Sequence, residues 1–119
     1  MKIKWLDTSE DHDYPAAQSY LSLIYEDGAA AGYVEKLRLA SISEFKAKDI
    51  FRASGLPLLP ADNLHVAKDV QKIKAGQALS PLLLVRDTGN GKLVIADGYH
   101  RLCAVYSYDE DALIPCKIV

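Results

Sequence analysis

The chain has 119 residues, of which 50% are hydrophobic and 25% charged, and its formal net charge is −2. This length suits one domain with a single core, and this composition is typical of folded globular proteins and excludes a disordered chain. Because proteins that grip a nucleic-acid backbone usually carry an excess of lysine and arginine, the slight acidity disfavours nucleic acid as a partner.

The N-terminus and the two cysteines predict a reduced, cytoplasmic protein. The opening sequence MKIKWLDTSEDHD turns acidic at once, so no signal peptide is expected, and the longest apolar runs are too short to cross a membrane. Cys103 and Cys116 fit no metal-ligand spacing and are too few for a disulfide framework. Both lie in apolar stretches, where a free cysteine behaves as a small hydrophobic residue.

The first third of the chain predicts a pair of helices. Pro15 suits a first helical turn, and over residues 16–25 apolar residues recur at steps of three and four: Ala17, Tyr20, Leu21 and Ile24. The glycine-containing stretch EDGAAAG breaks this pattern, and a second helix is predicted over residues 33–40. We expect the two helices to run antiparallel. Their tyrosines are expected to be core or dimer-interface residues, which makes the pair the expected contact of a homodimer: Tyr20, Tyr25 and Tyr33.

The middle of the chain predicts a strand and two helices. Residues 42–47 form the expected strand, and residues 47–53 a helical turn that stops at Gly55. Asp62 or Asn63 can cap the next helix. The apolar stripe of that helix and the glycine that closes it are Val66, Val70, Ile73 and Gly76.

The last third predicts a hairpin, a helix and a terminal strand. PLLLVRD and KLVIAD are strand-like runs, and the Asn90-Gly91 pair between them is a strong hairpin signal. A helix over about residues 98–106 follows. In the final strand, LIPCKIV, Pro115 suits either a sheet edge or the beginning of a strand.

The segment VIADGYHRLCA joins the second hairpin strand to this helix with an unusual set of polar residues. The first N–H groups of a helix lack partners and carry the positive end of its dipole, so an anion such as phosphate binds well there. Gly98 would let the backbone approach the ligand, and Arg101 offers a fork that suits phosphate oxygens. His100 can donate to a phosphate or move a proton, and Asp97 can hold hydrated Mg²⁺ or act as a base.

The same residues have a purely structural interpretation. Asp97 could cap the helix, Gly98 could serve the turn, and His100 and Arg101 could be exposed helix residues. The motif by itself leaves both interpretations open.

Roughly the C-terminal two thirds of the chain resembles the ParB/sulfiredoxin superfamily, in the segments SPLLLVRD, KLVIADG, GYHRLCA and IPCKIV. The resemblance implies an α+β fold in a single domain, residues 1–119. This domain would hold a mixed sheet with packed helices over residues 45–119, preceded by a helical extension over residues 1–44. The segments KAKDIFRAS and HVAKDVQKI resemble those that bring an arginine and a lysine to the nucleotide pocket of sulfiredoxins. The matching residues here are Arg52 and Lys68.

Three branches of this superfamily differ at the motif. Sulfiredoxins carry Gly-Gly-Cys-His-Arg, whereas this chain has Tyr99 in place of the reactive cysteine, and Cys103 lies a helical turn further on, facing the core. ParB-type CTPases carry Gly-Glu-Arg-Arg, which this chain lacks, so centromere binding is not expected. The free-serine kinases carry Asp-Gly-His-His-Arg, which differs here only at Tyr99. That branch uses a glutamate of its N-terminal part as a base, and only rough position suggests Glu44 or Asp49 for that role.

The resemblance therefore implies a nucleotide-binding protein, with ATP- or ADP-dependent phosphotransfer to a small hydroxyl-bearing metabolite as its reaction. A nucleoside di- or triphosphate would be bound by Gly98, Tyr99, His100, Arg101, Lys68 and Arg52. Asp97 and His100 would be catalytic, and Asp97 would place Mg²⁺.

Other interpretations of function remain beside this one. The chain could be a non-catalytic regulatory module that senses a nucleotide or a protein partner, with the N-terminal helices as the partner surface. A nuclease is disfavoured by the acidity and by the absence of a paired-carboxylate metal site in the sequence. His65 is expected to be structural or to face the same pocket as Lys68, and Lys72 and Lys74 are expected to lie on a solvated helix face.

Overall fold

A four-stranded mixed sheet organises the chain, and the computed structural model describes residues 2–119. The strands are β1 (Ser43–Lys46), β2 (Leu82–Asp87), β3 (Lys92–Asp97) and β4 (Leu113–Ile118), in the order β1-β4-β2-β3. β2 and β3 form an antiparallel hairpin, β1 is antiparallel to β4, and β2 is parallel to β4. The predicted α+β class is confirmed.

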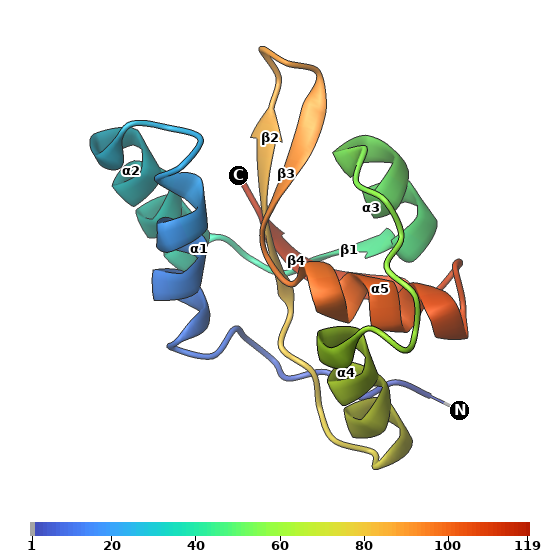
Figure 1. Ribbon diagram of the computed structural model, residues 1–119. Helices are drawn as coiled ribbons and strands as arrows, with labels where there is room; N and C mark the ends of the chain where they lie inside the picture. Colours follow the sequence, from blue (N-terminus) through green and yellow to red (C-terminus); the bar gives the residue numbers. More distant parts are fainter. Residues whose placement is uncertain (1) are drawn as a thin grey trace.

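Helices cover both faces of the sheet (Figure 1). They are α1 (Asp13–Leu21), α2 (Asp27–Leu39), α3 (Ala47–Ser54), α4 (Leu64–Lys74) and α5 (Tyr99–Tyr108). Leu83 and Val85 of β2 pack toward α1 and α2, whereas Leu82 and Leu84 pack toward α3, α4 and α5. The run LLLV is therefore apolar at every position because both faces of the strand are buried.

The two N-terminal helices exist as predicted, but their bounds differ from the prediction. α1 begins at Asp13 and ends at Leu21, and α2 begins at Asp27, so that Gly28 and Gly32 lie inside it. Glycine costs a helix about 1 kcal/mol relative to alanine. Burial of one face of α2 on the sheet, including the fully buried Ala30, outweighs that cost.

The prediction that the C-terminal strand suits a sheet edge is wrong, because β4 lies between β1 and β2. Pro115, which has no N–H to donate, stands opposite Glu44 of β1. Pairing with β2 starts only at the next residue, where Cys116 aligns with Leu82. The alternative prediction, a proline near the beginning of a strand, fits this position with respect to β2.

Several local predictions for the middle of the chain are confirmed. α3 stops at Gly55, whose φ is 68°, and Asn63 rather than Asp62 caps α4. The Asn63 side chain accepts hydrogen bonds from the backbone N–H groups of His65 (3.0 Å) and Val66 (3.2 Å).

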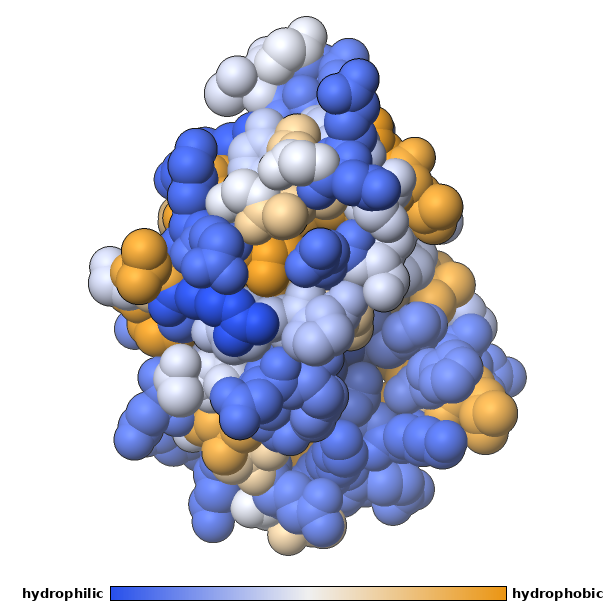
Figure 2. Space-filling model, turned by 90° about the vertical axis from the view of Figure 1, so that its left-hand side faces the viewer, coloured by the Kyte–Doolittle hydropathy of each residue, from blue (hydrophilic) through white to orange (hydrophobic). Residues whose placement is uncertain are grey.

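The surface formed by α1 and α2 is mostly hydrophilic, with hydrophobic residues in separate places rather than in one continuous patch (Figure 2). The large apolar residues exposed in this part of the chain are Tyr20, Leu23, Ile24 and Leu39. Tyr25 and Tyr33 instead pack on each other, with ring centroids 5.0 Å apart. The homodimer stays a prediction. Within residues 2–119, no helix combines the length and the apolar character needed to cross a membrane.

Candidate functional site

The start of α5 is an uncapped helix N-terminus reached through a glycine. Gly98 occupies the N-cap position with φ 112°, and no side chain caps the helix. A Cβ atom at Gly98 would lie 2.7 Å from Cγ of Leu82 and 2.9 Å from Nη2 of Arg101. Only glycine therefore fits this turn. Asp97 therefore does not cap the helix, and the first N–H groups of α5 have no capping side chain in the described residues.

One face of α4 lies against this turn. Its residues follow the spacing i, i+3, i+4 and i+7, which places them on a single side of a helix. Together with residues 97–101 they line a cavity of about 230 Å³: His65, Lys68, Asp69 and Lys72. The structure thus brings Lys68 to the predicted motif, and His65 faces the same cavity.

Arg101 is the most constrained cation of the site. Its Nη2 atom donates to Oδ2 of Asp97 at 3.1 Å and to the carbonyl of Pro81 at 3.4 Å, and its side chain is 16% exposed. Its Nε is buried without a hydrogen-bond acceptor in the described residues. An unsatisfied buried donor of this kind costs about 1–3 kcal/mol, which a bound acceptor would recover.

Asp97 belongs to a carboxylate pair that the sequence did not reveal. Burial raises its pKa, and this effect outweighs the opposing effects of the charge of Arg101 and the hydrogen bond from it. The charge of Asp13 and a hydrogen bond with Asp13 contribute smaller increases. Asp13, in the first turn of α1, is only 3% exposed. Its carboxylate accepts the backbone N–H of Glu10 at 3.0 Å and the hydroxyl of Ser80. Asp13 and Asp97 are thus two acids that are distant in sequence and adjacent in the fold, and residues 2–119 contain no cluster of three or more potential metal ligands.

Two imidazoles that line the cavity lie close together. The ring centroids of His65 and His100 are 4.9 Å apart, and the ring centroid of Tyr99 is 5.6 Å from that of His100. Burial lowers the pKa of His100, and the proximity of His65 lowers it further, against the opposing effect of Asp69. His100 is consequently neutral at pH 7, with one nitrogen able to accept a proton.

This lowered pKa predicts a pH dependence of stability. Between the folded pKa of His100 and its ordinary value near 6.5, the unfolded chain binds more protons than the native one. Acidification below about pH 6.5 should therefore reduce the free energy of unfolding through His100, with no contribution above that pH. Urea denaturation at pH 5.0 and 7.5 should show a larger loss for the wild type than for His100→Gln. Equal losses in the two proteins would contradict the assignment.

Asp69, which sequence reasoning did not single out, sits among these cations. Its side chain is 14% exposed, and its carboxylate lies 3.9 Å from Nζ of Lys72. Burial raises its pKa, although the positive charges of Lys72 and Arg101 favour its ionised form. Lys72, expected on a solvated face, also lines the cavity. Asp69 and Lys72 lie on the same face of α4 as Lys68. The sequence spacing indicates this shared face, but it assigns that face to the site only once α4 is known to pack on α5.

Tyr99 has a structural role at the position where the resembling families carry cysteine, glutamate or histidine. Its hydroxyl donates to the carbonyl of Pro57 at 2.5 Å and so ties the segment after α3 to the start of α5. Cys103 faces the core as expected, is fully buried, and burial raises the pKa of its thiol. It is therefore not an activated nucleophile.

Three residues singled out in the sequence lie outside the cavity. Arg52 has a side chain that is 83% exposed, and its guanidinium is 3.7 Å from Asp49 on the same helix. Glu44 is exposed on β1, opposite Pro115. Asp49 lines a different cavity, beside α3. The geometry therefore supports neither a clamp role for Arg52 nor a base role for Glu44 or Asp49 at the start of α5.

No family model, curated protein or solved structure matches the chain. The resemblance to the ParB/sulfiredoxin superfamily therefore rests on the quoted sequence motifs alone.

Proposed function

We propose that this protein binds the phosphate groups of a nucleoside di- or triphosphate at the start of α5. One observation carries the proposal: the uncapped helix N-terminus at Gly98 shares a cavity with Arg101, whose buried Nε has no acceptor in the described residues. Helix amides and a guanidinium are the donors that phosphate oxygens accept best. A phosphate bound between the first amides of α5 and the Arg101 guanidinium would accept hydrogen bonds from both groups.

The charges around the cavity support an anionic ligand. Three cationic side chains face two carboxylates there, and both carboxylates already have partners: Asp97 pairs with Arg101, and Asp69 with Lys72. Lys68 has no carboxylate within 4.0 Å in the described part of the chain, so its charge is available to a ligand.

The size of the cavity indicates which part of the ligand it holds. Sites that enclose whole small molecules measure about 300–1,000 Å³. At about 230 Å³, this cavity suits phosphate groups, with the nucleoside over its rim. Discrimination between bases would then depend on residues outside the cavity.

Lys68 provides a direct test of this charge arrangement. Lys68→Ala should weaken binding of inorganic tripolyphosphate about fivefold, the loss typical of one exposed ion pair of about 1 kcal/mol. Lys74→Ala is the matched control, because Lys74 lies on the same helix, is exposed and does not line the cavity. Calorimetric titration at constant ionic strength measures both. An equal loss in the two variants would mean that only net charge matters and would contradict the placement of Lys68.

Phosphotransfer to a small hydroxyl-bearing metabolite is the more specific form of the proposal. The acceptor oxygen attacks the terminal phosphorus, the bond from that phosphorus to its bridging oxygen breaks, and the shortened nucleotide leaves. The hydroxyl proton passes to the neutral imidazole of His100. Arg101, Lys68 and the α5 amides stabilise the charge on the transferring group.

Mg²⁺ fits the donors of this site. The ion is commonly held by one or two carboxylates together with phosphate oxygens, and Asp97, with Asp13 behind it, supplies that chemistry. Bound there, the ion would neutralise charge on the phosphate oxygens. If Asp97 does not hold Mg²⁺, its carboxylate would instead orient the acceptor hydroxyl.

A non-catalytic module is the second candidate. It is favoured because polar groups of the site are already bonded within the protein. The Asp97 carboxylate already pairs with Arg101, and the hydroxyl of Tyr99 is bonded to the backbone. Turnover separates the two candidates: an enzyme converts ATP or ADP in the presence of a hydroxyl-bearing amino acid or sugar, and His100→Gln binds nucleotide without turnover. A module binds nucleotide and converts none with any acceptor.

A further inference from the structure

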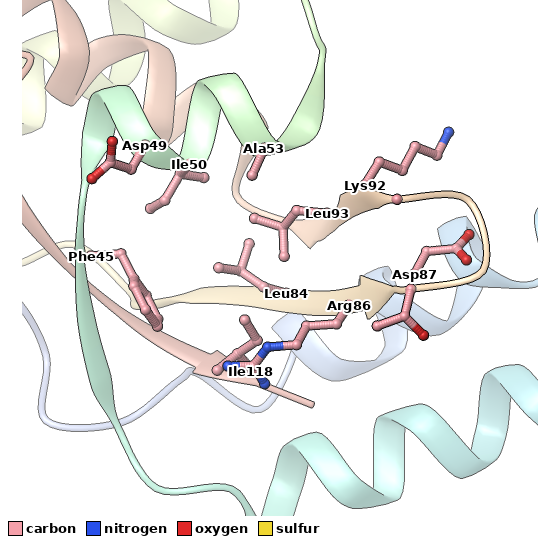
Figure 3. A pocket seen from close by; sticks show the side chains of 12 residues that line it. Phe45, Asp49, Ile50, Ala53, Leu84, Arg86, Asp87, Lys92, Leu93 and Ile118 are labelled. Atoms are coloured by element: carbon pink, nitrogen blue, oxygen red, sulfur yellow. The ribbon is translucent and has the colours of Figure 1, made fainter.

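A second cavity, of about 530 Å³, lies between α3 and the β2–β3 hairpin, on the α3 side of the sheet (Figure 3). Its volume lies within the range of about 300–1,000 Å³ seen for small-molecule sites. Apolar side chains make its floor and one wall: Phe45, Ile50, Ala53, Leu84, Leu93 and Ile118. It shares no lining residue with the cavity at the start of α5.

The topology explains why this cavity is open. Leu82, Leu84 and Arg86 alternate onto the same face of β2. α5 follows β3 and covers the Leu82 end, whereas α3 is only eight residues long and stops at Gly55. The hairpin extends past these helices (Figure 1), so that the apolar surface around the half-buried Leu93 is left with a wall on one side only.

The charged residues at the rim of this cavity indicate the charge that a bound ligand would carry. Asp49 pairs with Arg52 at 3.7 Å, and Asp87 accepts from the side chain of Asn90 at 2.9 Å. Asp87 also interacts with Tyr25, on the opposite side of the sheet. Burial is the main reason that the pKa of Tyr25 is raised to about 12, and the charge of Asp87 is the second. Both acids therefore have other partners.

The rim cations are uncommitted. Arg86 extends beside Ile118 at the edge of the apolar floor, and Lys92 lies at the hairpin end (Figure 3). In residues 2–119 no carboxylate lies within 4.0 Å of either cation. A planar guanidinium next to an apolar floor matches a carboxylate attached to an apolar body, because the fork binds both carboxylate oxygens at once.

We propose that this cavity binds a small monocarboxylic acid with an apolar body, whose chain lies on Phe45, Leu93 and Ile118 and whose carboxylate meets Arg86. The site is separate from the one at the start of α5. The two sites can therefore be occupied independently.

Three ten-carbon probes that differ only in the head group test the proposal: decanoate, decanol and decylammonium. Each is titrated into ¹⁵N-labelled full-length protein below its micelle concentration. Decanoate should bind at least about tenfold more tightly than decanol, as expected for one charge-assisted contact. The amides of Ala53, Arg86 and Leu93 should shift, and those of His65 and Gly98 should not. Shifts at His65 and Gly98 instead would place the acid at the α5 site and overturn the proposal.

Two variants separate the head group from the body. Arg86→Gln, a change at an exposed side chain, should remove the preference for decanoate over decanol. Lys74→Gln, at an exposed residue of α4 outside both cavities, should leave that preference intact. Ala53→Trp, at an exposed helix position that lines the cavity, should fill the space and abolish binding of both probes. Binding that survives Ala53→Trp, a preference that survives Arg86→Gln, or no binding of any probe would overturn the proposal.

Discussion

Arg101→Ala is expected to lower the affinity for a nucleoside triphosphate about 100-fold or more, the largest effect of any single change at the site. A guanidinium contributes two charge-assisted hydrogen bonds to phosphate, each of about 1.5–3 kcal/mol, and a factor of ten in affinity corresponds to about 1.4 kcal/mol. Arg101→Lys keeps the charge but loses the fork, so that an intermediate loss is expected. Calorimetric titration measures all three proteins.

The stability of these variants needs a control of its own. Removing Arg101 leaves the buried carboxylate of Asp97 beside Asp13 without its cation, which costs stability. The double variant Arg101→Ala/Asp97→Asn removes this unpaired buried charge. Its thermal unfolding midpoint should be close to that of the wild type. Arg52→Ala, which deletes an exposed guanidinium outside the cavity, should bind nucleotide normally. Wild-type affinity in the folded double variant would show that Arg101 does not bind the ligand.

Gly98→Ala is expected to destabilise the protein by roughly 3 kcal/mol, as backbone strain of about 1–2 kcal/mol adds to crowding of about 1–3 kcal/mol. The strain follows from φ 112°, and the crowding from a Cβ atom 2.7 Å from Cγ of Leu82. Leu82 is fully buried and has no room to move. The unfolding midpoint should fall by about 10 °C in a domain of this size.

Gly32→Ala is the matched control for this substitution. Gly32 lies inside α2, with nothing within 4 Å of its would-be Cβ and no positive φ. Alanine there should raise the free energy of unfolding by about 0.5–1 kcal/mol, because glycine is a poor helix former. Differential scanning calorimetry of both variants should show shifts of opposite sign. An unchanged midpoint for Gly98→Ala would contradict the described start of α5.

The sequence predicted best those elements whose signals are local. The hairpin followed from two apolar runs around Asn90-Gly91, and the end of α3 from Gly55, because turn chemistry depends on a few adjacent residues. The start of α2 was missed because Gly28 and Gly32 lower local helix propensity, whereas burial on the sheet, which no local pattern reports, stabilises the helix.

The candidate site was predictable only in its contiguous part. Residues 97–101 adjoin along the chain, so the motif could be recognised before the fold was known. Asp13 lies in the polar stretch EDHD and resembles a solvated residue, and its partners Ser80 and Asp97 are distant in sequence. Its burial depends on α1 packing against β3, a tertiary contact. Asp69 was missed for the same reason. The face of α4 that carries Asp69 becomes part of the cavity only because α4 packs on α5.

The proposed phosphate site is tested most directly by the thermal unfolding of the wild type with ATP, ADP, CTP and GTP, each with and without Mg²⁺. A ligand at a hundred times its dissociation constant stabilises the native state by about 2.7 kcal/mol, enough to raise the midpoint by several degrees. We expect such a rise with at least one nucleotide, and its loss in Arg101→Ala/Asp97→Asn. No shift with any nucleotide at millimolar concentration, or a shift that the double variant retains, would contradict a phosphate site at the start of α5.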